Sequence, residues 1–167
     1  MMRGIVPSLV IFFLVACTSA NDSSTSVEAV YLVQGEGQLT QEDLQSHPEI
    51  LVTNDFDDFK KLTEGRVAIW IDMNSAGLVD IEWLKEKHKK YYPVVLVGDG
   101  DELCSFMVTL WYVELEGPGG YECDPPPPGF SVNVRTSDTG GKWHGYKETP
   151  TVEAILGVTN PLLQGIQ

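Results

Sequence analysis

Basic residues are scarce in this sequence. Lysine and arginine together number 11 against 24 aspartates and glutamates, which gives a formal net charge of −13. Such an excess of negative charge repels phosphates, so the composition argues against nucleic acid as a partner. The same repulsion argues against attraction to an anionic lipid surface. A solvated acidic surface is the simplest explanation of the charge, and divalent cations or cationic partners are the alternatives.

Several motifs of catalysis and metal binding are also missing. The sequence has no CxxC pair, no cysteine–histidine cluster at zinc spacing and no GxSxG nucleophile motif. Gly35 and Gly37 are not followed by the third glycine that a dinucleotide-binding fingerprint requires. The three histidines stand in separate segments, and only His144, in a glycine-rich stretch beside Trp143, is a candidate contact residue. The absence of a recognisable nucleophile or base in the sequence favours a binding function over a catalytic one.

The N-terminus carries one hydrophobic run, which is too short to span a bilayer stably. It follows Arg3 and ends just before Cys17. A positive charge followed by a short apolar run and small residues is typical of a signal peptide. The end of the run, LVAC, resembles the lipobox of bacterial lipoprotein precursors. That resemblance implies that residues 1–16 are removed and that Cys17 carries the lipid, with an ordinary signal cut near Ala20 as the alternative.

The lipobox resemblance covers only the N-terminal segment, and it implies a place in the bacterial cell envelope. Lipoproteins of diderm bacteria are held at the inner membrane by an Asp after the cysteine. Here that residue is Thr18, so the resemblance implies the outer membrane if the organism is a diderm. Residues 17–26 are small and polar, and we expect them to form a flexible tether. Residues 27–167 are then a single domain that contacts the membrane through the lipid alone.

Lipidation of Cys17 would leave two cysteines in the domain. An exported compartment permits a disulfide between Cys104 and Cys123. Cys104 falls in a segment with helical character and Cys123 in a proline-rich loop, so a bridge is feasible. Two free or buried thiols are the alternative.

The domain alternates strand-like and helix-like segments. Capping residues and apolar periodicity indicate helices between the strands. Five strands separated by helices predict an α/β fold with a small doubly wound, mostly parallel five-stranded sheet, flavodoxin-like or Rossmann-like. The stretch SDTGGKWHGYKE, residues 137–148, is expected to be a loop. The expected strands are residues 27–33, 49–53, 66–72, 92–98 and 130–136.

Acidic residues follow two of these strands at the edge where such sheets bind ligands. Asp72 and Asp99 fall at strand ends, and Asp101 follows in the stretch GDGDE. Carboxylates that converge on one edge would suit Mg²⁺ or Ca²⁺, so these three residues are a candidate metal site. Turns and helix caps, each stabilising by about 1 kcal/mol, are the simpler explanation. They account for Asp101 better than for Asp72 and Asp99.

An apolar strand followed by GDG and another acid is similar to the acidic motif of the haloacid-dehalogenase-type phosphatases. That family needs an Asp-x-Asp nucleophile motif after its first strand. Here the first strand ends in LVQGEGQ, without an Asp, and the later Asp72 has Asn74 where the second Asp should stand. We therefore expect a non-enzymatic module that binds a small ligand or a partner protein. The alternative is a metal-assisted hydrolase that uses Asp72 and Asp99.

We expect the ligand between the Asp72 loop, the Asp99 loop and the segment 137–148. This last segment is rich in glycine, and a mobile loop of that kind can close over a bound molecule. Its candidate contact residues are Lys142, Trp143, His144 and Tyr146. The three segments share an edge only if the strand at residues 130–136 runs parallel to its neighbours.

Overall fold

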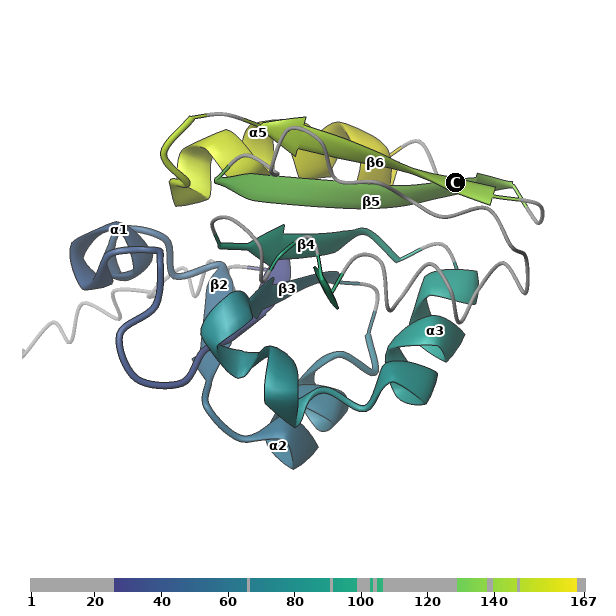
Figure 1. The fold of residues 1–167 in the computed structure, drawn as a ribbon. Coiled ribbons are helices and arrows are strands. Elements are labelled where there is room, and N and C mark those ends of the chain that lie inside the picture. Colours follow the sequence, from purple (N-terminus) through teal and green to yellow (C-terminus); the bar gives the residue numbers. More distant parts are fainter. Residues whose placement is uncertain are drawn as a thin grey trace, which may run out of the picture.

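Four parallel strands and an antiparallel hairpin form one sheet in the computed structural model (Figure 1). The structure describes residues 26–65, 67–90, 92–98, 103, 105–106, 129–137, 140–146 and 148–164. Within them the strand order is β2-β1-β3-β4-β5-β6, and the first four are parallel. The strands are β1 (Ala29–Leu32), β2 (Ile50–Thr53), β3 (Ala68–Asp72), β4 (Val94–Val97), β5 (Phe130–Ser137) and β6 (Gly140–Tyr146).

Helices cover both faces of the sheet. On one face lie α2 (Phe56–Leu62) and α3 (Ile81–Lys89), and on the other lies α5 (Val152–Gln164) (Figure 1). The short helix α1 (Gln41–Gln45) packs Leu44 on the α5 face. A 3₁₀ helix, η1 (Met73–Leu78), follows β3 directly. None of the helices in the described part of the chain is long and apolar enough to cross a bilayer.

Short polar side chains start these helices. The Thr40 hydroxyl accepts a hydrogen bond from the Asp43 amide at 3.1 Å, as the sequence predicts for α1. Asp55 accepts from the Asp58 amide at 2.9 Å at the start of α2. Asp80 serves α3 in the same way. Each cap satisfies an amide that the first turn leaves unpaired, which stabilises by about 1 kcal/mol.

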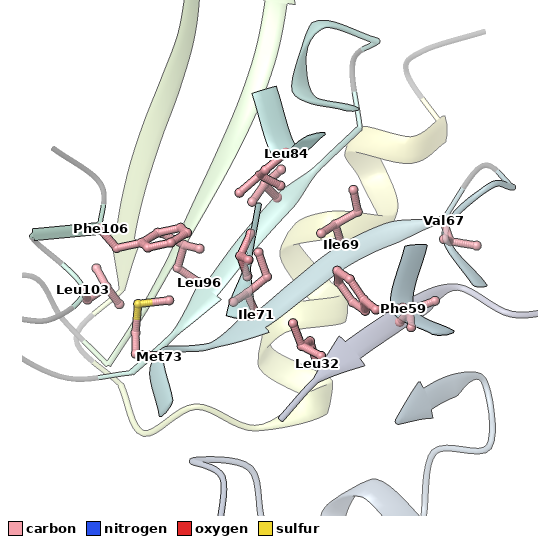
Figure 2. Packing of buried hydrophobic residues seen from close by; sticks show 13 residues of the cluster. Leu32, Phe59, Val67, Ile69, Ile71, Met73, Leu84, Leu96, Leu103 and Phe106 are labelled. Carbon is pink, nitrogen blue, oxygen red and sulfur yellow. The ribbon is translucent and has the colours of Figure 1, made fainter. Parts of the chain in front are cut away.

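The two faces of the central strands bury separate cores, which explains why these strands are apolar at nearly every position. Figure 2 shows the first core, where Phe59 of α2 and Leu84 of α3 pack on the sheet. Alternate residues of the same strands, among them Tyr31 and Trp70, form the second core beneath α5. The sheet residues of the first core include Val30, Leu32, Ile69, Ile71, Val94 and Leu96.

The mostly parallel sheet expected from the sequence is parallel in its first four strands, whereas the fifth strand, whose direction the sequence left open, is antiparallel. β5 pairs antiparallel with β4, with Phe130 opposite Val97. The direction of β5 follows from the place where the chain returns to the sheet. Gly129, just before β5, lies beside Gly98, just after β4, and the Gly98 amide donates to the Gly129 carbonyl at 3.2 Å. The connection therefore begins and ends at the same edge, and β5 must run back along β4. Most of the predicted 137–148 loop is in fact β6, which pairs antiparallel with β5.

Candidate functional site

Asp72 ends β3 as a fully buried carboxylate whose two oxygens both accept hydrogen bonds from this chain. Oδ2 accepts from the Tyr31 hydroxyl and, at 2.7 Å, from the Gln38 amide. Oδ1 accepts from the Asn74 amide at 3.0 Å and so caps η1. A buried charge is tolerated when it is hydrogen-bonded in this way. The structure thus gives Asp72 an anchoring and capping role that the sequence pattern left unexplained.

Further hydrogen bonds fasten the loop between β1 and α1, residues 33–40, to the start of η1. The Gln34 amide donates to the Ser75 hydroxyl at 2.6 Å. The Asn74 side-chain amide donates to the Glu36 carbonyl at 2.8 Å. Together with the bond from Gln38 to Asp72, they hold the loop at the carboxyl edge of β1 and β3.

Gly37 lets this loop approach the buried pair Tyr31–Asp72. A Cβ atom at this position would lie 2.5 Å from Val33 Cγ2, 2.9 Å from the Tyr31 hydroxyl oxygen and 3.1 Å from Asp72 Oδ2. No side chain fits there without displacing its neighbours. Gly35 has a φ of +67°, which glycine adopts without strain. The glycines of the GEG stretch therefore serve loop geometry, a role that a search for nucleotide-binding motifs does not detect.

Burial raises the pKa of the Tyr31 hydroxyl well above its ordinary value, and the hydrogen bond to the Asp72 carboxylate raises it further. Desolvation disfavours the phenolate, and a neighbouring carboxylate repels it. The phenol therefore keeps its proton and donates a hydrogen bond to Asp72.

A hollow of about 550 Å³ opens beside the loop, at the carboxyl ends of β1 and β2, and we call it the β1–β2 hollow. Its volume falls in the range of small-molecule sites. Among the described residues that line it, Glu36 is the one with a charged side chain, and Val52 at the rim is 48% exposed. The chemistry suits a neutral or cationic, partly apolar group. The lining residues are Tyr31, Val33, Gly35, Glu36, Gly37, Leu39, Thr40, Gln41, Leu44 and Val52.

The antiparallel direction of β5 removes the predicted site between Asp72 and the 137–148 segment. Trp143 pairs with Asn133, which pairs with Val94 at the amino end of β4. Asp72 instead pairs with Val97 at the carboxyl end. Lys142 lies beyond Trp143 on the far side from Asp72, and His144 stands opposite Val132, the third residue of β5. The structure therefore does not bring Lys142, Trp143 and His144 to the edge that holds Asp72.

Of the four candidate residues predicted on this segment, Tyr146 is the one that reaches this edge. It pairs with Phe130, which in turn pairs with Val97 in the same row as Asp72. The rings of Phe130 and Tyr146 stack with their centroids 4.6 Å apart. This contact joins the two strands of the hairpin, β5 and β6.

The other predicted site residues lie outside the described residues. They are Cys17, Asp99, Asp101, Cys104 and Cys123. The lipid anchor, the metal site and the disulfide therefore stay predictions. Within the described ranges, no group of three or more His, Cys, Asp or Glu side chains is placed to hold a metal ion.

A comparison of the chain with family models, with curated proteins and with solved structures finds no match. The function must therefore be argued from the residues of the site.

Proposed function

We propose that the protein is a lipid-anchored module of the bacterial cell envelope that binds a ligand or partner protein without catalysis, at the β1–β2 hollow. One observation carries this proposal. Both oxygens of Asp72, the candidate acid at this edge, accept hydrogen bonds from the chain itself, and Oδ2 holds the loop that walls the hollow. A carboxylate whose oxygens already accept hydrogen bonds from the protein is a poor catalytic group. Its structural role favours a binding function at a preformed surface over hydrolysis.

We also infer that the domain is a variant of the doubly wound, flavodoxin-like class. The order of its parallel strands, β2-β1-β3-β4, begins the order of that class, and helices lie on both faces. In such sheets ligands bind where the strand order reverses, which here is between β1 and β3. The β1–β2 hollow and the loop at residues 33–40 adjoin that point. The antiparallel β5 and β6 are the departure from the class.

The anchoring part of the proposal rests on the sequence. LVAC ends a short apolar run, and residues 17–26 are small and polar. A flexible chain of this length spans about 17 Å on average. A domain on such a tether stays close to the lipid headgroups, where it can meet envelope components.

Filling the hollow tests the binding proposal. The full chain in a neutral detergent would be screened by ligand-observed NMR against a fragment library with neutral, cationic and anionic members. We expect neutral and cationic fragments to bind the wild type and to lose binding in Val52→Trp, whose side chain occupies the rim.

Leu62→Trp is the matched control, because Leu62 is an exposed apolar residue, 39% accessible, on α2. It should bind the fragments as the wild type does, and melting curves should confirm that both variants are folded. Fragments that bind Val52→Trp as well as wild type would overturn the assignment of the hollow, as would a library without any binder.

A further inference from the structure

β2 is an open edge of the sheet, since among the described strands it pairs only with β1. The Glu49 carbonyl accepts from the Glu28 amide at 3.0 Å. The Thr53 carbonyl accepts from the Val33 amide at 2.9 Å. The odd-numbered residues of β2 therefore face β1. Because backbone groups alternate along a strand, Val52 turns its N–H and C=O toward the open edge.

This open edge adjoins the β1–β2 hollow. Val52 stands opposite Tyr31 in the parallel register, so their side chains share a face, and both line the hollow. Val52 remains 48% exposed at the rim. A strand added beside β2 would carry alternate side chains on that face. One of them would lie over the hollow, which gives strand addition a pocket for specificity.

The chain segment that contains this edge has an excess of negative charge. Residues 26–59 contain eight acids and no lysine or arginine. The first lysines that follow neutralise two of these eight acids within α2, where Lys60 contacts Asp57 at 2.7 Å. Lys61 contacts Asp58 at 3.0 Å. The acids are Glu28, Glu36, Glu42, Asp43, Glu49, Asp55, Asp57 and Asp58.

Charge also decides between the possible occupants of the edge. Open edges invite pairing with a second copy of the same chain. A second copy would bring the same acids, with Glu49 and Asp55 at the two ends of each β2, and like charges would oppose the contact. A basic segment would gain from the same field.

We propose that an extended, lysine- or arginine-rich segment of a partner protein adds to β2 as a further strand. It pairs with the N–H and C=O of Val52, seats an apolar side chain in the β1–β2 hollow and sets its cationic side chains against the surrounding acids. This inference rests on the proposed function and names the partner of the same site.

A short peptide of alternating lysine and valine is the probe, with its glutamate–valine counterpart as the charge control. Binding to the full chain in a neutral detergent would be followed by fluorescence anisotropy. We expect the lysine peptide to bind at least about tenfold more tightly at low salt, with the difference shrinking as salt rises. Equal affinities for the two peptides would overturn the charge assignment.

Val52→Pro against Val52→Ala tests the strand pairing. Both lose the valine side chain, but only proline removes the N–H at the open edge, and this N–H makes no bond to β1. We expect affinity for the lysine peptide to fall by about tenfold more in Val52→Pro than in Val52→Ala. Equal affinities of the two folded variants would overturn the pairing.

Val52→Lys against Val52→Glu tests the same surface with the backbone unchanged, so the inference stays falsifiable if Val52→Pro does not fold. Lysine should weaken and glutamate strengthen binding of the lysine peptide, and an absence of any difference would contradict the proposal. If fragments bind the hollow but the lysine peptide does not bind the protein, the proposed function is supported and only this further inference is refuted.

Discussion

The hydroxyl of Tyr31 donates a hydrogen bond to the carboxylate of Asp72, and both side chains are fully buried. The bond joins neighbouring strands, β1 and β3, at the edge where the β1–α1 loop begins. Because the Gln38 amide donates to the same carboxylate oxygen, this pair also holds the loop in place. Changes to the pair should therefore affect both the stability of the fold and the shape of the hollow.

Asp72→Ala should strongly destabilise the domain. It leaves the buried Tyr31 hydroxyl and the amides of Gln38 and Asn74 without their acceptor, and each such loss costs about 1–3 kcal/mol. Asp80→Ala is the control, because it removes an exposed helix cap worth about 1 kcal/mol. Urea unfolding measures both, and equal losses would contradict the anchoring role of Asp72.

Tyr31 should make the fold sensitive to alkaline pH. Its pKa is raised in the folded state by burial and by Asp72, whereas the unfolded chain loses this proton near pH 10. The contribution of Tyr31 is therefore fully present below about pH 10 and falls by about 1.4 kcal/mol per pH unit above it. Tyr31→Phe should be less stable at neutral pH but should show a shallower decline above pH 10. Parallel declines in urea titrations would refute this account.

Gly37→Ala should destabilise the fold by about 1–3 kcal/mol through overpacking. The added methyl group meets Val33 at 2.5 Å and the Tyr31–Asp72 pair within 3.1 Å. Gly77→Ala is the matched control, since its added Cβ meets no atom within 4 Å beyond its chain neighbours and the backbone of its own helix. Thermal melts of the two variants make the comparison, and a Gly37→Ala protein as stable as Gly77→Ala would show that the loop is not tightly seated.

Metal titration separates binding from metal-assisted hydrolysis. We expect calorimetry with millimolar Mg²⁺ or Ca²⁺ to give no saturable heat, because the Asp72 carboxylate already accepts hydrogen bonds at both oxygens. Saturable binding that is lost in both Asp72→Asn and Asp99→Asn would instead favour the hydrolase. A melting curve of each variant must show that it is folded.

The lipid anchor predicts where the protein partitions. The wild type should fractionate with membranes, and Cys17→Ala should not be processed normally because the thiol that accepts the lipid is missing. Ser24→Ala, in the tether, is a control that should behave as the wild type does. Equal release of wild type and Cys17→Ala into the soluble fraction would rule out the anchor.

Local patterns in the sequence were sufficient for most of the elements. The buried strands β1, β3 and β4 are apolar at almost every position because both of their faces are covered. Thr40 and Asp55 cap helices where a short polar side chain precedes an apolar period. These features depend on residues a few positions apart, so the sequence alone determines them.

Only the tertiary structure decided the direction of β5 and the partners of Asp72. A strand has the same apolar pattern whichever way it runs, and the connection that reverses it is closed by a bond between Gly98 and Gly129, far apart in the sequence. Asp72 meets Tyr31 across 41 positions. Such contacts depend on the order of the strands in the sheet, and the local hydrophobic periodicity of the sequence does not predict them. The sequence thus determined that acids stand at strand ends, while the packing of β1 against β3 made Asp72 an anchor and left the hollow beside it.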